Sequence, residues 1–245
     1  MIDGEERYDG TWVVLPTYDE AENLPGISSA ILAALPGARL LVVDDASPDG
    51  TGRLADELAA DEPRMRVLHR AGKEGLGKAY LAGFEVVIEA GAGCVVQMDA
   101  DWSHAPEALP SLVDAIQAGA DLVIGSRYVR GGGVEGWGLH RRLISRGGSI
   151  FARTMLALEP HDLTGGFKAW KRETLAAIDW DGVHSGGYVF QIEMTHLASR
   201  AGARVVEVPI VFKDREVGQS KMSGGIITEA LGVVLKLGWQ NLRGR

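Results

Sequence analysis

The stretch Cys94-Val95-Val96-Gln97-Met98-Asp99-Ala100-Asp101 carries the strongest structural signal in the sequence. Its first five residues form a mostly apolar run that is too short for a helix and is typical of a buried strand. Two carboxylates follow at positions i and i+2, so both can approach one point beyond the strand. Carboxylate oxygens suit Mg²⁺ or Mn²⁺. The stretch therefore predicts a strand that ends at a metal site; the alternative is a pair of loop acids capping the helix that begins at Pro106.

Short apolar runs of the same kind recur along the first half of the chain. Strands are predicted at Trp12–Leu15, Leu40–Val43, Leu122–Ile124 and, with a less regular pattern, Arg64–His69. Helices are predicted between them, at Leu24–Leu35, Arg53–Ala60, Gly77–Ala90 and Pro106–Ala118. The alternation predicts an α/β fold, with a mostly parallel central sheet and helices on both faces. Ligands bind such a sheet beyond the carboxyl ends of its strands, so a site is expected in the loops after Leu15, Val43 and Met98.

Composition indicates a folded protein of a reducing compartment. The 245 residues are 46% hydrophobic and 24% charged, which suits one large domain and argues against a disordered chain. Cys94 is the single cysteine, so no intramolecular disulfide can form and a cytoplasmic location is expected. No apolar run has the length of a membrane-spanning helix, and the acidic first ten residues do not resemble a secretory signal.

The two halves of the chain differ in charge. Up to Ser126 there are 8 Lys and Arg against 22 Asp and Glu, a net of −14, whereas the remainder has 17 against 11, a net of +6. A carboxylate-rich half can hold a metal, and a basic half can bind phosphate or approach an anionic lipid surface. The alternative is a solvated surface with chance asymmetry. The overall net charge of −8 makes nucleic acid a poor partner.

The second half has a less regular pattern. We expect a flexible glycine-rich connection at Gly131–Gly136, followed by a basic stretch at His140–Arg146. A strand is expected at Arg204–Phe212, where Pro209 indicates an edge or a bulge. A mobile polar loop at Asp214–Gly225 and an amphipathic helix at Ile226–Leu242 then follow. The last helix lies on a bilayer, docks on a membrane partner or packs on the protein's own core.

Two further polar segments follow predicted strands. In the segment Asp44–Thr51, acids at a strand end can accept hydrogen bonds from a ribose or a base, and helix capping by Ser47 or Asp49 is the alternative. In the segment Leu15–Glu20, Tyr18 can lie against a flat base or simply be exposed.

Together these segments resemble the family 2 glycosyltransferases of GT-A fold, and within them most closely the dolichol-phosphate (polyprenol-phosphate) mannose synthases. The matching segments stand in family order, at Leu15–Pro25, Asp44–Thr51, Met98–His104, Gly125–Tyr128, Ile144–Gly147, Asp162–Phe167, Gly187–Met194 and Asp214–Lys221. Asp19 stands where relatives more often have Asn, and Gly165 where many have Ser. Neither departure removes an implied ligand.

The resemblance implies a single GT-A nucleotide-diphospho-sugar transferase domain over residues 1–245, with an amphipathic helix at 226–245. It implies inverting transfer of mannose from GDP-mannose to a polyprenyl (dolichyl) monophosphate, with Mg²⁺ or Mn²⁺ as cofactor. The implied nucleotide-sugar ligands are Pro16, Tyr18, Glu20, Val43, Asp45, Asp99, Ala100, Asp101, Arg215 and Lys221. The implied metal ligands are Asp99, Asp101 and Ser103, the implied acceptor-phosphate ligands are Arg127, Arg141 and Ser145, and the implied catalytic residues are Asp101 and Arg127.

The ionisation of the acceptor phosphate is consistent with this implied reaction. A phosphate monoester loses its second proton near pH ~6, so the acceptor oxygen is ionised at neutral pH and needs no strong general base. Catalysis is then expected to rest on positioning and on neutralising the leaving diphosphate. The basic half would receive the lipid headgroup at the cytoplasmic face of a membrane, with an integral membrane protein as a further candidate partner. Two alternatives stay open: a UDP-glucose-dependent polyprenyl-phosphate glucosyltransferase, and a non-catalytic nucleotide-binding subunit.

Overall fold

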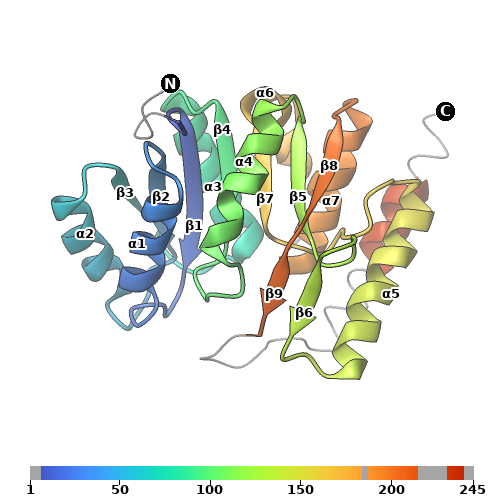
Figure 1. Cartoon of the computed structure of the whole chain (residues 1–245), viewed down its shortest axis with the longest axis horizontal. Coiled ribbons are helices and arrows are strands. Elements are labelled where there is room, and N and C mark those ends of the chain that lie inside the picture. The colour runs from blue at the N-terminus through green and yellow to red at the C-terminus, as the bar shows by residue number, and fades with distance from the viewer. Residues whose placement is uncertain (1–6, 184–186, 215–230, 240–245) are drawn as a thin grey trace.

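A computed structural model describes residues 7–183, 187–214 and 231–239. The strands of its main sheet are β1 (Thr11–Thr17), β2 (Arg39–Asp44), β3 (Met65–His69), β4 (Cys94–Gln97), β5 (Leu122–Ser126), β7 (Lys168–Lys171) and β8 (Val205–Pro209). They form one seven-stranded sheet in the order β3-β2-β1-β4-β7-β5-β8 (Figure 1). Only β7 runs antiparallel to its neighbours in this sheet. The predicted α/β fold with a mostly parallel central sheet is therefore confirmed.

Helices cover both faces of the sheet. The helices are α1 (Leu24–Ala34), α2 (Thr51–Asp61), α3 (Leu76–Glu89), η1 (Pro106–Ala108), α4 (Leu109–Gln117), α6 (Arg172–Ala176), η2 (Trp180–Gly182) and α7 (Gly187–Arg200). Helices α1, α2 and α4 share one apolar cluster with Val13 and Leu15, while α3, α6 and α7 share another with Trp12 and Val14. Alternate residues of one strand thus enter opposite cores, which is why these strands have continuous apolar runs.

The glycine-rich connection after β5 is closely packed in the structure. Gly132 donates its N–H to the carbonyl of Val129, and a Cβ at Gly132 would lie 2.5 Å from the carbonyl oxygen of Ser126. The following residues form strand β6 (Gly133–Glu135). The glycines therefore allow close backbone approach, and the expected flexible connection is instead part of a small sheet.

The predicted single strand at 204–212 is two strands. After β8 ends at Pro209, the chain leaves the main sheet and continues as β9 (Val211–Lys213), which pairs in parallel with β6. Ile210 makes the transition, because its N–H bonds Ser126 and its carbonyl accepts the N–H of Gly133. The prediction of one continuous strand was therefore wrong, because a proline that cannot donate to the ladder separates two pairing partners here. The predicted edge position is confirmed, because β8 is the last strand of the main sheet.

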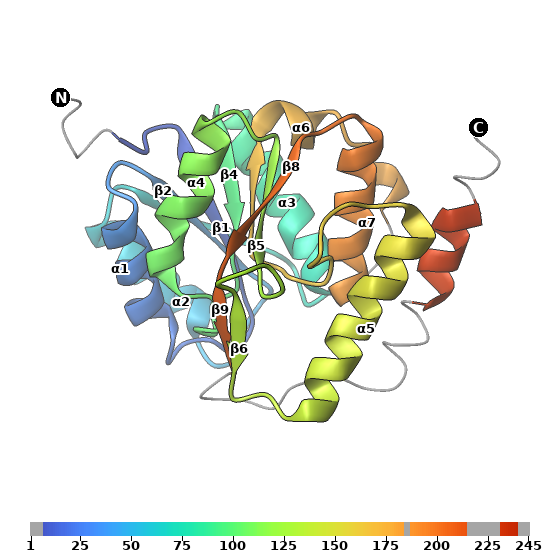
Figure 2. The ribbon, with the colours of Figure 1, turned by 45° about the vertical axis from the view of Figure 1, so that its right-hand side comes forward.

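The long helix α5 (Leu139–Leu156) follows β6, and the helical residues 231–239 lie beside it (Figure 2). Val234 and Leu237 share a buried cluster with Ala152 and Leu156 of α5 and Ile192 of α7. The described part of the predicted C-terminal helix thus packs on the protein's own core. Within the described ranges, no helix combines the length and apolar character that crossing a bilayer requires.

Candidate active site

The carboxyl ends of β1, β2 and β4 surround a cavity of about 220 Å³, here called the β1–β4 cavity. Seven of the residues predicted to bind a nucleotide sugar line it: Pro16, Tyr18, Glu20, Asp45, Asp99, Ala100 and Asp101. The predicted residue Val43 does not line the cavity, because its side chain is fully buried in the core. There it packs so closely against Gly83 of α3 that a Cβ at Gly83 would lie 3.0 Å from a methyl of Val43. The remaining lining comes from Thr17 and from the start of α3, with Lys73, Gly75, Leu76 and Ala79.

Hydrogen bonds join the β1 loop to the β2 loop. Ser47 Oγ accepts the N–H of Asp19 and donates to Asp44 Oδ1 at 2.6 Å. Asp49 in turn accepts the N–H of Ala21. Asp49 Oδ1 also accepts the N–H of Thr51, the first residue of α2, at 3.0 Å. Ser47 and Asp49 therefore hold the two loops together, and the capping alternative is confirmed for Asp49, whose carboxylate bonds the start of α2.

Each of the three loops contains one non-glycine residue in the left-handed backbone region. These residues are Asp19 (φ 60°), Ala46 (φ 54°) and Trp102 (φ 61°). Such conformations cost roughly 1–3 kcal/mol each and persist where surrounding contacts over-determine them. Asp and Asn tolerate this region better than most residues, so Asp19 preserves the turn that an Asn would make. The three strained residues therefore lie in the loops at the end of the sheet where the cavity is found.

The segment before α3 brings two basic side chains to this region, of which Lys73 lines the β1–β4 cavity and Arg70 pairs with a lining residue. Lys73 Nζ lies 3.4 Å from the centroid of the Tyr18 ring, and both residues line the cavity. Arg70 forms a largely buried ion pair with Asp45 and a second pair with Glu74. Sequence reasoning missed both cations. The signal for Lys73 was its place in the glycine-rich segment after β3, whereas nothing in the sequence pairs Arg70 with Asp45.

The two aspartates after β4 have different surroundings. Asp99 Oδ1 accepts the hydroxyl of Tyr80 at 2.7 Å, and its backbone N–H donates to His104 Nδ1. Burial, reinforced by the charge of Asp99, raises the pKa of Tyr80 well above its usual value, so the hydroxyl keeps its proton. Burial lowers the pKa of His104, so the ring is neutral and its proton lies on Nε2. Asp99 is thus oriented by a buried donor, and His104 supports the loop.

Asp101 is 5% exposed, and its Oδ1 accepts the N–H of Ser103 at 3.0 Å. The hydroxyl oxygen of Ser103 is buried and has no hydrogen-bond partner in the described part of the chain. No cluster of three or more His, Cys, Asp or Glu among the described residues could hold a metal. Three oxygen-bearing side chains, those of Asp99, Asp101 and Ser103, nevertheless fit a hard divalent cation whose remaining ligands are substrate phosphates and water.

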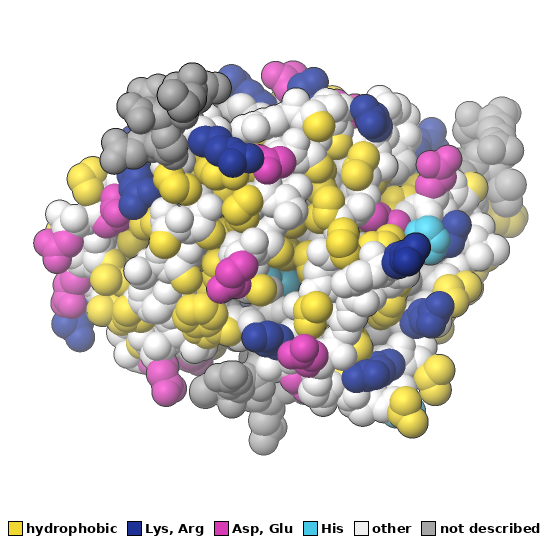
Figure 3. All heavy atoms as spheres, in the orientation of Figure 1, with side chains coloured by type: hydrophobic (Ala, Val, Ile, Leu, Met, Phe, Trp, Pro, Cys, Tyr) yellow, Lys and Arg dark blue, Asp and Glu magenta, His cyan; other side chains and the backbone are white. Residues whose placement is uncertain are grey.

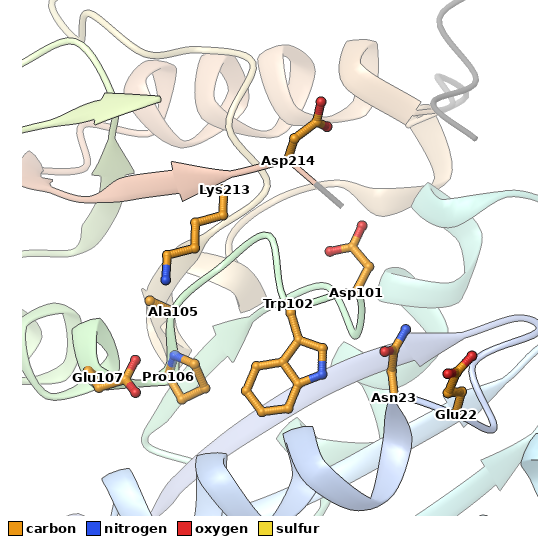
Figure 4. Close-up of a pocket in the computed structure, with 9 residues that line it drawn as sticks. All are labelled: Glu22, Asn23, Asp101, Trp102, Ala105, Pro106, Glu107, Lys213 and Asp214. Carbon is orange, nitrogen blue, oxygen red and sulfur yellow. The ribbon is translucent and has the colours of Figure 1, made fainter. Parts of the chain in front are cut away.

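A second cavity of about 420 Å³, here called the Trp102 cavity, is also lined by Asp101 (Figure 4). The Trp102 indole lies between Asn23 and Pro106, and Lys213 reaches toward it from β9. Because Asp101 lines both cavities, they meet at its carboxylate. Apart from Asp101, no residue that lines the Trp102 cavity belongs to the predicted site. These other lining residues are Glu22, Asn23, Trp102, Ala105, Pro106, Glu107, Lys213 and Asp214.

Arg127, at the end of β5, forms a buried ion pair. Its Nε and Nη2 each donate to Asp162 at 2.6 Å, and Nη2 also donates to Thr164 Oγ1 at 2.8 Å. Asp162 is fully buried, which opposes its ionisation, but the charge and hydrogen bonds of Arg127 prevail and lower the pKa of Asp162. Sequence reasoning placed Arg127 at the acceptor without foreseeing its carboxylate partner, which lies 35 residues further along the chain.

The three predicted acceptor residues lie in one cluster. Ser145 of α5 accepts the hydroxyl of Tyr128 and lies 3.4 Å from Thr164 Oγ1, which Arg127 also contacts. The guanidinium groups of Arg127 and Arg141 both lie over the Trp137 ring, at 5.4 and 4.1 Å from its centroid. Arg141 also donates to Asp214 at 2.7 Å. Arg215 and Lys221, predicted to close over the donor, lie outside the described residues.

Comparisons with known proteins show the family of the chain. The model of the family described as "Glycosyl transferase family 2" matches residues 12–179. The chain is 50% identical over 236 residues to an undecaprenyl-phosphate mannosyltransferase of Micrococcus luteus, covering 95% of this chain and 97% of that protein. It is 52% identical to a polyprenol monophosphomannose synthase of Mycolicibacterium smegmatis, covering 96% of this chain and 88% of that protein.

More distant relatives are also similar. A dolichol-phosphate mannosyltransferase of Pyrococcus furiosus is 40% identical, and the match covers 92% of this chain but 62% of that protein. Among solved structures, glucosyl-3-phosphoglycerate synthase of Mycobacterium tuberculosis, in complex with Mn²⁺, UDP and glucosyl-3-phosphoglycerate, aligns with a TM-score of 0.68 at 20% identity. That alignment covers 95% of this chain and 81% of the other, so the two proteins share a fold.

Proposed function

The chain belongs to glycosyl transferase family 2 and is a glycosyltransferase of GT-A fold, and from that premise we propose its reaction. It transfers mannose from GDP-mannose to the phosphate of a polyprenyl monophosphate, with inversion at the sugar carbon. The observation that carries the proposal is the identity of about half of all aligned residues, over nearly the whole chain, to two bacterial enzymes named for polyprenyl-phosphate mannosyl transfer.

The β1–β4 cavity supports the nucleotide half of the donor. The Tyr18 ring offers a face for a base, and the carboxylates of Glu20 and Asp45 can accept hydrogen bonds. Guanine carries an exocyclic amino donor that uracil lacks, so acidic side chains here favour a guanosine nucleotide over a uridine one. Lys73, at the same cavity, supplies a positive charge for the diphosphate.

A divalent cation would be held by Asp99, Asp101 and Ser103, and when bound it supplies a Lewis acid that neutralises the leaving diphosphate. Two hydrogen bonds within the chain orient the carboxylates of Asp99 and Asp101. The Tyr80 hydroxyl fixes one oxygen of Asp99, and the N–H of Ser103 fixes one oxygen of Asp101. The sugar would occupy the Trp102 cavity, whose acids, amide and lysine can hydrogen-bond its hydroxyls beside the Asp101 carboxylate.

The cluster of Arg127, Arg141 and Ser145 supports the acceptor half. In the proposed displacement an ionised phosphate oxygen forms a bond to the sugar carbon while the bond from that carbon to the diphosphate oxygen breaks. The arginines hold and orient the acceptor phosphate, and no group needs to remove a proton from it. Arg215 and Lys221 are proposed to close over the donor. We place the protein peripherally on the cytoplasmic face of a membrane, where the lipid acceptor is found.

A matrix of donors and acceptors tests the proposal. Purified protein is incubated with GDP-mannose or UDP-glucose, with polyprenyl phosphate or no acceptor, and with Mg²⁺, Mn²⁺ or a chelator. We expect a mannosylated lipid only where GDP-mannose, polyprenyl phosphate and a divalent cation are combined. A glucosylated lipid made from UDP-glucose would replace the proposal with the glucosyltransferase alternative, and the absence of product in every combination would contradict both.

Asp101→Asn provides the site-directed test. The change is nearly isosteric, so we expect turnover to be abolished while the unfolding midpoint changes little. The matched control is Asp56→Asn on α2, an exposed aspartate that lines neither cavity, which should leave turnover unchanged. If Asp101→Asn retained full activity, or retained its biological role without activity, the catalytic assignment would be wrong and the non-catalytic alternative would stand.

A further inference from the structure

A buried row of hydrogen bonds joins α7 to the strand that precedes the metal acids. Trp170 Nε1 donates to Gln97 Oε1 at 3.0 Å, and Gln97 Nε2 donates to Gln191 Oε1 at 2.8 Å. Trp170 and Gln97 are fully buried, and Gln191 is 2% exposed. Gln97 ends β4, two residues before Asp99, and Gln191 belongs to α7. The row therefore leads from the core of the sheet toward the proposed cation site.

The direction of these hydrogen bonds is fixed at the Trp170 end. An indole N–H can only donate, so the amide oxygen of Gln97 faces Trp170 and its NH₂ group faces Gln191. The Gln191 amide then accepts with its oxygen and turns its NH₂ group away from Gln97. Gln191 Nε2 is buried and has no hydrogen-bond partner in the described part of the chain. Buried polar groups are nearly always paired with protein or with water, so this NH₂ group indicates a partner that is not protein.

The main chain of Gln191 is also held in place. Lys168 Nζ donates to the carbonyl of Gln191 at 2.7 Å and to Thr195 Oγ1 at 2.8 Å. Lys and Arg side chains are spread over the surface of the face drawn in Figure 3, whereas Lys168 is fully buried. Because both the carbonyl and the amide oxygen of Gln191 accept hydrogen bonds from buried donors, its NH₂ group is held in one position.

This NH₂ group and the carboxylate of Asp99 border the same small space beside Gly166. A Cβ placed on Gly166 would lie 3.4 Å from Gln191 Nε2, 3.6 Å from Asp99 Oδ2 and 3.7 Å from Cε1 of His104. The Tyr80 hydroxyl donates to the other oxygen of Asp99, Oδ1. The space thus lies between a donor and an acceptor and has about the size of a methyl group. A water molecule there can accept from the amide and donate to the carboxylate.

We propose that Gln191 is a positioning residue for the cation site: its NH₂ group donates to a water beside Gly166, and that water donates to Asp99 Oδ2. Together with the Tyr80 hydroxyl on Oδ1, this bridge holds the carboxylate from both sides. Groups that orient a metal ligand in this way strengthen metal binding without touching the metal. The inference rests on the proposed function, because the cation at Asp99 is part of it, but cation binding tests it without any transfer of sugar.

Manganese binding to the full chain provides the first test. Mn²⁺ alone is titrated into the protein, and the free ion is measured by electron paramagnetic resonance. Gln191→Met replaces the amide with an apolar group of similar size, so the Kd for Mn²⁺ should rise about tenfold. The change also leaves Gln97 Nε2 without its acceptor, and urea unfolding should show a loss of stability.

Gly166→Ala tests the water bridge without breaking the row of hydrogen bonds. Its methyl would make only ordinary van der Waals contacts, so the unfolding midpoint should change little. The methyl would take the place of the water, so the Kd for Mn²⁺ should again rise about tenfold. The matched control is Gly93→Ala just before β4, where a Cβ would approach only the carbonyl oxygen of Gly10, at 3.8 Å. This control should bind Mn²⁺ as the wild type does.

The double variant Gln191→Met/Gly166→Ala shows whether the two changes act through one water. Changes that remove the same water do not add, so the double variant should bind Mn²⁺ no more weakly than Gln191→Met alone. Wild-type affinity in either single variant would overturn the proposal, as would additive losses in the double variant or a wild type that does not bind Mn²⁺. Weakened and non-additive Mn²⁺ binding, combined with a wild type that transfers no sugar, would support the positioning role and contradict the proposed reaction.

Discussion

Replacing Asp162 with Asn tests whether its buried ion pair stabilises the acceptor side of the site. Asp162 is fully buried and accepts three hydrogen bonds from Arg127, two from the guanidinium at 2.6 Å and one from the backbone N–H at 3.0 Å. The amide would leave a guanidinium donor facing an NH₂ group, with the positive charge still buried. Removing one partner of such a pair costs about 3–5 kcal/mol. For a chain of this size, that lowers Tm by roughly 6–20 °C.

Urea unfolding of wild type and Asp162→Asn measures this loss. The matched control is Glu57→Gln, which breaks an exposed pair with Arg53 and should cost only a few tenths of a kcal/mol. The folded pKa of Asp162 is lowered, so its contribution is present above the unfolded value of about 3.9 and is lost as pH falls through the folded value. The difference from wild type should therefore be largest near neutral pH. If Asp162→Asn unfolded no more readily than Glu57→Gln, the pair would have no such role.

Three further predictions concern the interior. Tyr80→Phe removes the donor that orients Asp99, so titration should show divalent-cation binding weakened by about tenfold; unchanged affinity would contradict the positioning role. Burial lowers the pKa of Lys168 to about 7, so the unfolded state binds more protons above that value and the free energy of unfolding should rise with pH between about 7 and 8.5. Lys168→Met should lack this rise, and parallel profiles for the two proteins would refute it. Gly83→Ala would place a methyl 2.5 Å from a valine methyl of β1 and should cost about 1–3 kcal/mol in urea unfolding, whereas Gly147→Ala, with nothing within 4 Å, should not destabilise.

The first half of the fold could be predicted because its information is local. Strands β1, β2, β4 and β5 are buried on both faces, so each has an apolar run ended by polar residues, and β4 contains the clearest example. The predicted helix at 24–35 agrees with α1 to within one residue at its end. The acids at these strand ends then had to meet at one edge of a parallel sheet, and seven predicted residues do line one cavity there.

The second half could not be predicted in the same way because its structure depends on distant partners. Strand β7 is inserted antiparallel between β4 and β5, and nothing in the sequence Lys168–Lys171 indicates that position. Lys168 is fully buried because its Nζ donates to the carbonyl of Gln191 and to Thr195. Helix α5 was predicted only as a basic stretch. Gly147 and Gly148 interrupt its helical pattern, and the exposed leucines Leu139 and Leu143 obscure which of its faces is buried. Such features are decided by tertiary contacts that a local pattern does not contain.

The acceptor side of the site is one connected unit, which explains why motif matching found its members but not their arrangement. Thr164 lies between Arg127 and Ser145, and the Trp137 ring lies against both Arg127 and Arg141. These contacts connect the end of β5 with α5 through the segments before and after this helix, which contain Trp137 and Thr164. Ser145 and Arg141 of α5 thus reach Arg127 through Thr164 and Trp137, while Asp162 holds Arg127 directly. A sequence motif can mark each of these residues, but the order in which they contact one another exists only in the folded chain.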